Sequence, residues 1–531
     1  MQMNKNKIQI WLPLLLSLSM IVGMYVGFKI HDNIPSRSFF YREKQRPIQE
    51  VLDLIQQHYV DDVEMGKLTD TAIQSILEHL DPHTVYIAPN ELEQINERIQ
   101  GSFYGVGIEF DIFNDTLHVL QVMKDGPGNK AGIIAGDKII RANNQSLTGP
   151  KLTADSIRSI LKGNRGSQLS IELIRGAQSI KKTVVRDMIA INSIDAAYMI
   201  APGIGYIKIN EFTTQTYREF MLALQGLKKQ GLAKLVLDLR GNGGGILDEA
   251  IDIADELISG DKLITYTEGR HAPKQEYRCK RPGQFENGPL VVLADEGSAS
   301  ASEVLMGALQ DWDRATIVGR PSFGKGLVQQ QYDLSNRGAL RLTIARYYSP
   351  MGRSIQRSYA NGSKAYYQEI DDRFSNGKAV GQGSVYADST KVFTTSAGKK
   401  LYGGGGIHPD YFIPADTSLF QSEILSLYQT GSLTHFAYEF AQQEQRLLGA
   451  YKGAKAFSDS FHLQPHQWKQ FEQFNQKDTL HLSSWTTNEK AFVEKTIIAA
   501  IARMTWGNEA YFISMNNKDS YLEKALQLLR K

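Results

Sequence analysis

The segment PLVVLADEGSASASEVLMGALQDW, residues 289–312, predicts a buried strand that passes through a short turn into a helix. The strand PLVVLAD is apolar without alternation, which is typical of a strand covered on both faces. Ser300 precedes Glu303 by three residues, the spacing of a capping box, so Ser300 can simply cap the helix. The same position also exposes the serine hydroxyl beside first-turn N–H groups, beginning with that of Ala301, which can stabilise an oxyanion.

Strands and helices alternate on both sides of this segment. Strand-like runs are IGYIKINEF and KLVLDLR, and helix-like runs are YREFMLALQGLKKQG and ILDEAIDIADELIS, all within residues 189–415. This alternation predicts an α/β class with a layered core. The turn LDLRGNGGG, residues 237–245, follows a buried strand, and its glycines let backbone N–H groups approach a ligand closely. It lacks a clean G-x-G-x-x-G spacing at a helix start, which counts against a nucleotide loop.

The segment GRPSFGKG, residues 319–326, resembles a phosphate-binding P-loop. Gly326 stands where a P-loop has Ser or Thr, and the following GLVQQQYDL favours a strand over a helix, so a P-loop NTPase is disfavoured. Lys325 is flanked by glycines and lies close to Phe323 and Leu327. Burial there would lower its pKa and allow the neutral amine to act as a base.

Residues 101–188 combine β-rich runs, glycine turns and one helix from about Thr153. The order of a Gly-Val-Gly-Ile loop, the run AGIIAGDKII and the late helix resembles a PDZ domain. In such a domain, loop N–H groups hold a terminal carboxylate and the next strand pairs with an extended peptide. A small β domain whose glycines only make turns is the alternative. The resemblance assigns substrate contacts to Gly105, Val106, Gly107 and Ile108 in the loop, and to Ile157 and Leu161 as the groove wall.

Residues 8–28, IQIWLPLLLSLSMIVGMYVGF, carry no charge and follow Lys5 and Lys7. As a helix, this run would span roughly 30 Å. It predicts that residues 1–30 form a single-pass anchor in the inner membrane, with the catalytic part on the periplasmic side. A cleaved signal peptide is the alternative.

Helical patterns also flank the central domains. They predict an N-terminal helical region over residues 31–100 and a C-terminal helical extension over residues 416–531. The pattern assigns no chemistry to the extension. A role of the extension in assembly, as a homo-oligomer or with an adaptor partner, is left open.

Composition and spacing exclude several other classes. The 59 Lys and Arg residues nearly balance 57 Asp and Glu residues, which gives no support for a nucleic-acid partner. Cys279 is the only cysteine, so an internal disulfide is excluded and a thiolate zinc site is disfavoured. His79 and His83 are four residues apart, but Pro82 interrupts a helix that would carry both. We therefore expect surface histidines and no metal site.

Four motifs in order resemble those of the carboxyl-terminal processing peptidases, also called tail-specific proteases. They are D-L-R-G-N-G-G-G, E-G-S-A-S-A-S-E, S-F-G-K-G-L-V-Q and Y-G-G-G-G-I-H-P-D. The resemblance runs from about Val51 to Pro414 and includes the LDPHT link at residues 80–84. It implies a crotonase-like α/β protease core with an inserted PDZ domain. It also implies endopeptidase activity without cofactors, on proteins or peptides that have free apolar carboxyl ends.

By this resemblance, Ser300 is the nucleophile, Lys325 is the general base, and Gln329 orients the lysine. A noncatalytic, membrane-tethered PDZ adaptor on the same core is the alternative function. Loss of the serine or the lysine would mark that alternative, and both residues are present.

The resemblance also implies an oxyanion hole made of two backbone N–H groups. One belongs to Ala301, and the other to Gly244 or alternatively Gly245. The choice stays open because Gly243 stands where the family often has Pro, which loosens the turn.

Overall fold

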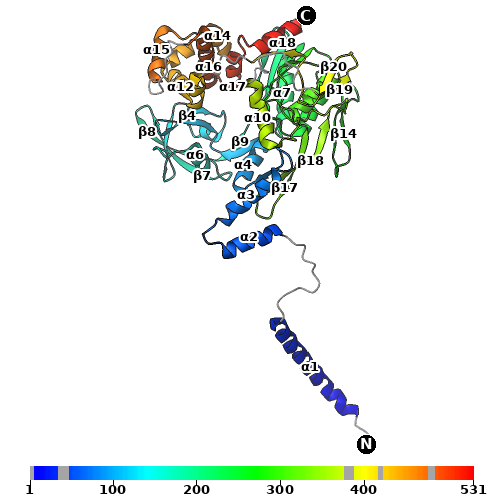
Figure 1. The fold of residues 1–531 in the computed structure, drawn as a ribbon. Helices are drawn as coiled ribbons and strands as arrows, with labels where there is room; N and C mark the ends of the chain where they lie inside the picture. Colours follow the sequence, from blue (N-terminus) through cyan, green and yellow to red (C-terminus); the bar gives the residue numbers. More distant parts are fainter. Residues whose placement is uncertain (1–4, 34–46, 376–387, 416–421, 476–484, 531) are drawn as a thin grey trace. The chain divides into compact units, whose positions relative to one another are not determined.

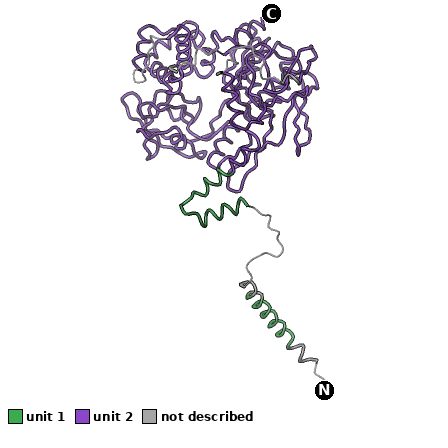
Figure 2. The backbone as a smooth tube through the Cα atoms, viewed as in Figure 1, with its two compact units in different colours: residues 1–72 green, residues 73–531 purple. Residues whose placement is uncertain are grey.

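The computed structural model of the protein describes residues 5–33, 47–375, 388–415, 422–475 and 485–530. The chain forms two compact units, residues 1–72 and 73–531 (Figure 2).

The first unit contains helices α1 (Lys5–Asn33) and α2 (Pro47–His58) and the start of α3 (Met65–Leu77). Helix α1 includes the charge-free run of residues 8–28, but the side chains of residues 8–10, 27 and 28 lie outside the described residues. In the part of the chain that the structure describes, no helix is both long and apolar enough to cross a membrane. The anchor over residues 1–30 stays a prediction.

The second unit contains a six-stranded sheet that separates two apolar clusters. Its order is β10-β11-β12-β15-β16-β21, and only the β10–β11 pair is antiparallel. The strands are β10 (Ile194–Ala201), β11 (Ile204–Ile209), β12 (Lys234–Asp238), β15 (Leu290–Ala294), β16 (Thr316–Gly319) and β21 (Tyr411–Phe412).

Both faces of this sheet are covered, as the unbroken apolar strands predicted. On one face, side chains such as Leu237 and Val292 pack with helices α7 (Thr216–Lys229), α8 (Leu247–Leu257) and α9 (Ala301–Asp311). On the other face, Val236 and Leu293 pack with helix α18 (Ser520–Arg530). The layered α/β core is confirmed, and part of one layer comes from the end of the chain.

A second sheet carries the residues that follow Lys325. Its order is β1-β18-β13-β14, with β17 paired to β18. The strands are β1 (Val85–Ile87), β13 (Leu263–Glu268), β14 (Gln275–Arg278), β17 (Leu327–Asp333) and β18 (Ala339–Tyr348). The strand expected after Lys325 is therefore present. Helix α10 (Gly362–Ser375) and the β19 (Asp388–Thr394) and β20 (Lys400–Gly403) pair complete this region.

The predicted PDZ domain has its own sheet and its own apolar core. The sheet order is β3-β4-β5-β7-β8, and β6 pairs with β5. The elements are β3 (Ile108–Phe113), β4 (Thr116–Val122), α5 (Pro127–Lys130), β5 (Lys138–Ala142), β6 (Gln145–Ser146), α6 (Ala154–Leu161), β7 (Gln168–Arg175) and β8 (Gln178–Val185). Strands β2 (Ser102–Gly105) and β9 (Asp187–Ala190) pair at its entry and exit, after helix α4 (Pro89–Gln100).

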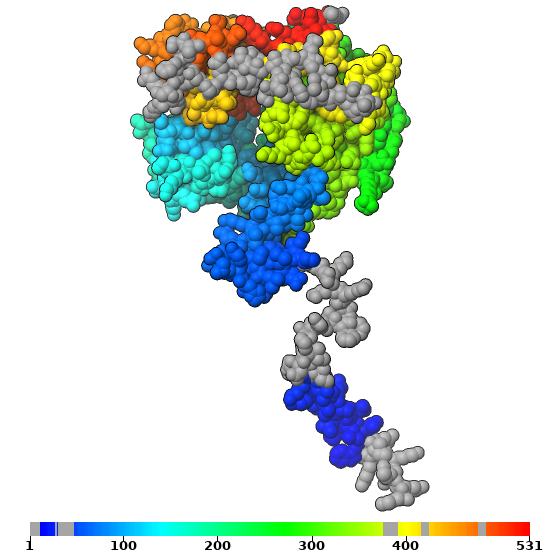
Figure 3. Space-filling view, in the orientation of Figure 1, coloured from blue at the N-terminus to red at the C-terminus, as the bar shows by residue number. Residues whose placement is uncertain are grey.

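The C-terminal helices form a separate apolar cluster. They contact the PDZ domain at β3 and β4, where Asp111 pairs with His435 and Phe113 stacks on Tyr438. Figure 1 shows α12 next to β4, and Figure 3 shows their gold and cyan surfaces in contact. The helices of this cluster are α11 (Ser422–Gln429), α12 (Ser432–Gln443), α13 (Gln445–Gly449), α14 (Ala454–Ser460), α15 (Pro465–Phe474), α16 (Thr487–Trp506) and α17 (Asn508–Met515).

Candidate active site

Ser300 lies between the turn after β15 and the first residue of α9. Its φ is 56° and its ψ is −116°, a backbone conformation that residues with a Cβ rarely adopt. The Gly-rich turn packs against it: a Cβ on Gly244 would lie only 2.7 Å from the Ser300 Cβ. This close approach explains why the turn requires glycine at residue 244.

Glu303 joins the segments that carry Ser300 and Lys325. It is 1% exposed, and its Oε2 accepts hydrogen bonds from the N–H groups of Ser300 and Lys325, both at 2.8 Å. Its Oε1 accepts from Ser322 Oγ at 2.5 Å and from the Gly324 N–H at 2.7 Å. Burial raises the pKa of Glu303 to about 6, although these four bonds oppose the shift. The sequence pattern identified Glu303 only as a capping partner, and its role as a bridge was missed.

These contacts also exclude the P-loop reading. In a P-loop, N–H groups of the glycine-rich segment hold phosphate at a helix start. Here the Gly324 and Lys325 N–H groups hold the Glu303 carboxylate, and strand β17 follows.

Tyr347 of β18 links the Lys325 segment to Ser300. The Tyr347 hydroxyl donates to the Lys325 carbonyl and is also hydrogen-bonded to the Ser300 side chain. Burial, and next the Arg341 charge, lower the pKa of Lys325 to about 8, whereas the Glu303 and Asp81 charges oppose the shift. At pH 7 roughly a tenth of such an amine is neutral, compared with less than a thousandth for an ordinary lysine.

Among the described residues, Gln329 makes no side-chain hydrogen bond to Lys325. It lies on β17, and its Nε2 donates to Thr343 Oγ1 of β18 at 3.5 Å. The orienting role of Gln329 stays a prediction, and its side chain is linked to the opposite strand.

The two sides of the predicted oxyanion hole lie next to each other, because the Cβ position of Gly244 is 3.0 Å from the Ala301 nitrogen. The Ala301 N–H makes no hydrogen bond to a described residue. The Gly244 N–H donates to Asn242 Oδ1 at 2.9 Å, whereas no described residue accepts from the Gly245 N–H. Gly245 is also confined, since a Cβ there would lie 2.0 Å from the Phe212 carbonyl oxygen.

The LDPHT link reaches the same region, which sequence reasoning did not predict. His83 is buried, so the expected surface position is wrong, and its Nε2 lies 3.0 Å from the Tyr366 hydroxyl. Burial and the nearby Lys325 charge lower the pKa of His83 to about 4. Among the described residues, no group of three or more His, Cys, Asp or Glu side chains is arranged to hold a metal ion. The only prior signal for this link was its place in the family resemblance.

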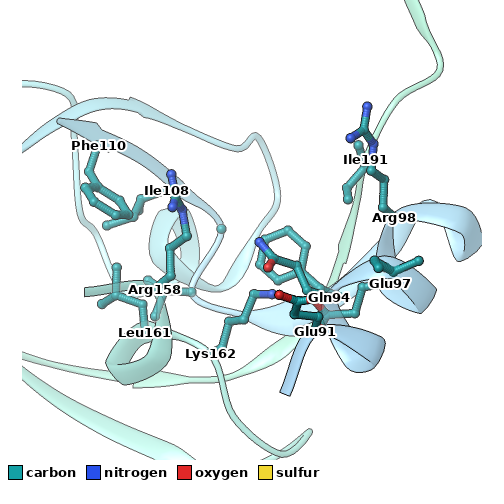
Figure 4. Close-up of a pocket in the computed structure, with 14 residues that line it drawn as sticks. Glu91, Gln94, Glu97, Arg98, Ile108, Phe110, Arg158, Leu161, Lys162 and Ile191 are labelled. Atoms are coloured by element: carbon teal, nitrogen blue, oxygen red, sulfur yellow. The ribbon is translucent and has the colours of Figure 1, made fainter. Parts of the chain in front are cut away.

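A cavity of about 660 Å³ lies along the predicted PDZ groove (Figure 4). Val106, Gly107, Ile108 and Leu161 line it, whereas Ile157 is fully buried in the PDZ core. The carbonyls of Val106 and Gly107 accept bonds from the Gly128 and Met123 N–H groups at 2.7 and 3.0 Å, which fixes the loop.

Helix α4 forms the other wall of this cavity. Glu91, Gln94, Glu97 and Arg98 of this helix contribute to the lining, and Glu97 forms an ion pair with Lys162 at the end of α6. In Figure 4 the Lys162 side chain extends toward the acidic residues of α4. The groove is therefore mixed: the PDZ side is apolar at its loop and at Leu161 but also carries Arg158 and Lys162, and the α4 side is mainly charged.

Two family profiles match the chain. The profile described as Peptidase family S41 matches residues 203–362, which include Ser300 and Lys325. A PDZ domain profile matches residues 118–175, a range that begins after the predicted carboxylate-binding loop.

Known proteins are similar over longer stretches. A carboxy-terminal-processing protease of Bartonella bacilliformis is 33% identical over 313 residues, which cover 58% of this chain and 71% of that protein. A probable CtpA-like serine protease of Staphylococcus epidermidis is 29% identical over 394 residues, covering 73% and 77% of the two chains. The structure of a photosystem II D1 C-terminal processing protease is 30% identical, covers 59% of this chain and 84% of its own, and has a TM-score of 0.34. The identity and coverage of the first relative show that this chain is a serine protease of peptidase family S41, in the carboxy-terminal-processing group.

Proposed function

We propose that this protease cleaves polypeptides that present a free apolar carboxyl end, with Ser300 as nucleophile and neutral Lys325 as general base. The observation that carries the proposal is the shared contact of both residues with Glu303 and Tyr347, at a buried site that lowers the pKa of Lys325 to about 8. A lysine needs such a shift to accept a proton near neutral pH.

In the proposed reaction, the Lys325 amine takes the Ser300 hydroxyl proton while Ser300 Oγ attacks the scissile carbonyl carbon. The developing oxyanion is stabilised by the Ala301 N–H and by an N–H of the Gly244–Gly245 turn. The Lys325 ammonium then gives its proton to the leaving amine, and an acyl-enzyme remains. Lys325 next activates a water molecule that hydrolyses this ester and frees Ser300.

For the second oxyanion donor, the hydrogen bonds of the turn favour Gly245. The Gly244 N–H would first have to leave Asn242 Oδ1, whereas the Gly245 N–H has no acceptor among the described residues. The first donor is the Ala301 N–H, because it belongs to the first residue of α9 and adjoins the nucleophile.

Substrate docking is proposed to occur at β3. Within the described sheet β3 pairs only with β4, so its other edge can accept an extended peptide. The N–H groups of residues 105–108 would hold the terminal carboxylate, and Leu161 with Ile108 would contact the last apolar side chain. Ile157 would support this wall from the core and make no direct contact.

The proposed membrane tether rests on sequence alone, namely the charge-free run of residues 8–28 after two lysines. The proposal places the catalytic part outside the cytoplasm. Membrane fractionation with an alkaline wash tests the tether. The full chain should stay in the pellet while a chain that begins at residue 47 is released, and release of both would contradict it.

Cleavage of a quenched fluorescent peptide with a free apolar carboxyl end tests the dyad. Ser300→Ala and Lys325→Ala should fold and lose cleavage, whereas Lys364→Ala removes an exposed lysine of the same unit and should keep it. Retained cleavage in either the Ser300→Ala or the Lys325→Ala variant would contradict the proposed mechanism. Amidation of the peptide carboxylate should slow cleavage. An unchanged cleavage rate would contradict the proposal that the PDZ domain binds the terminal carboxylate.

A further inference from the structure

We propose that Asp81 of the LDPHT link is a positioning residue for the dyad, because it holds Gln329 through Thr343 and directs its negative charge at Lys325. The proposal rests on Lys325 acting as the base. It gives the link before β1 a part in the reaction.

Asp81 is buried and makes more contacts than its own turn requires. Its Oδ1 accepts from the N–H groups of His83 and Thr84 at 2.8 and 3.0 Å, and its Oδ2 accepts from Thr84 Oγ1 at 2.6 Å. These three bonds form a local turn of the Asx type. A fourth bond crosses to the catalytic region, since Thr343 Oγ1 donates to Asp81 Oδ1 at 3.1 Å.

The fourth bond begins a chain that ends at Gln329. The Thr343 hydroxyl has one proton, and because that proton is used toward Asp81, its oxygen is oriented to accept from Gln329 Nε2. The Gln329 contact is long, 3.5 Å, and it ties the strand that directly follows Lys325 to β18. A second hydrogen bond joins β18 to the link, since the Thr343 N–H donates to Thr84 Oγ1 at 3.2 Å.

The charge of Asp81 acts on the same amine. Lys325 is faced by Arg341 from β18, Glu303 from α9, and Asp81 and His83 from the link. Arg341 disfavours the ammonium, whereas Glu303 and Asp81 favour it. His83 is neutral near pH 7, because its pKa is about 4. Asp81 therefore helps to set the pH at which Lys325 becomes a base, and it lies outside the segment that carries the dyad.

A purely structural role for Asp81 makes a different prediction. If Asp81 only closes its turn, its loss would lower stability and the amount of folded enzyme without moving the pH dependence of the reaction. Asp81→Asn separates the two roles, because an asparagine Oδ1 can still accept from the His83 and Thr84 N–H groups and from Thr343 Oγ1. The charge is lost, together with the Oδ2 acceptor of the Thr84 hydroxyl.

The test is the pH profile of kcat/KM for the full chain, with the quenched fluorescent peptide as probe. We expect Asp81→Asn to move the rising limb to lower pH, because a charge that favours the ammonium is removed. Thr343→Val should lower the plateau roughly tenfold or more while the limb stays in place, and Thr343→Ser should restore the plateau. Glu78→Gln removes an exposed carboxylate just before the link and should change neither quantity.

Two results would overturn the inference: a limb that does not move in Asp81→Asn, or a wild-type plateau in Thr343→Val. Lys325→Ala separates these failures from failure of the dyad itself. If Lys325→Ala is inactive at every pH and the Asp81→Asn limb is unmoved, only the role of Asp81 is lost. If Lys325→Ala retains cleavage, the base is not Lys325 and both proposals fail.

Discussion

Ser300 and Lys325 donate their backbone N–H groups to one atom, Glu303 Oε2, and both distances are 2.8 Å. The two residues are 25 positions apart in the chain, so this shared acceptor fixes the separation of their backbones. A buried carboxylate with four donors is costly to disturb, because each lost partner leaves a buried group unpaired.

Glu303→Gln should therefore impair both stability and activity. The amide keeps the size of the side chain but turns one acceptor atom into a donor, which then faces N–H or O–H groups. We expect a loss of about 1–3 kcal/mol in the free energy of unfolding, measured by urea denaturation, and a large loss of kcat. Glu93→Gln on α4 is a matched control at an exposed carboxylate. Wild-type kcat in Glu303→Gln would show that catalysis does not need the hydrogen bonds from Ser300 and Lys325 to the Glu303 carboxylate.

The glycines of the LDLRGNGGG turn should differ sharply in their tolerance of alanine. Gly244→Ala forces a Cβ to 2.7 Å from the Ser300 Cβ and 2.8 Å from the Ala299 carbonyl oxygen, so we expect cleavage to be lost. Gly243→Ala meets nothing within 4 Å and should retain cleavage. Parallel assays of the two purified variants check this, and equal activity would contradict the proposed packing.

Asp238 should be a source of stability that is lost in acid. It is buried, lies 2.6 Å from the Arg240 guanidinium and accepts from the Tyr206 hydroxyl at 2.8 Å. Although burial opposes the shift, Arg240 and Lys208 hold the pKa of this carboxyl far below its usual value of 3.8. Because the folded-state pKa is depressed, the stabilisation is present above about pH 4 and is lost as pH falls toward the folded-state pKa.

Asp238→Ala removes one partner of this buried pair and should cost about 3–5 kcal/mol at pH 7. Denaturant unfolding of wild type and variant at pH 7 and pH 3 gives the comparison. The difference between the two proteins should narrow at the lower pH. A constant difference would mean that the carboxylate charge contributes little.

The C-terminal helices should unfold more easily when their core is emptied. Phe457 is fully buried in this cluster, and Phe457→Ala should cost about 3–5 kcal/mol. Hydrogen exchange over residues 422–530 should rise in this variant, whereas Leu425→Ala, at a half-exposed position, should have little effect. Unchanged exchange in Phe457→Ala would contradict the observed packing.

The sequence predicted the parts of the fold that depend on local pattern. The unbroken apolar strands at Leu235 and Val291 anticipated a sheet covered on both faces, and the residues after Lys325 anticipated a strand. It did not predict that α18 would cover one of those faces. That contact joins residues almost 300 positions apart and leaves no local spacing signal.

For the candidate site, the sequence predicted the residues that lie in motifs but not the contacts between distant segments. Ser300 and Lys325 could be singled out because each lies in a motif with a distinctive pattern. Glu303 could be interpreted only as a cap, since three of its four donors, Ser322, Gly324 and Lys325, belong to a segment that only folding brings next to it. Asp81 and His83 were missed because their proximity to Lys325 is purely tertiary.

The pH dependence of kcat/KM for the wild-type chain tests the central claim most directly, because it reports the base of the free enzyme. The account predicts a rising limb of unit slope with a midpoint near the Lys325 pKa of about 8, and no measurable cleavage in Lys325→Ala at any pH. A midpoint below pH 7, or the same limb in Lys325→Ala, would contradict Lys325 as the base.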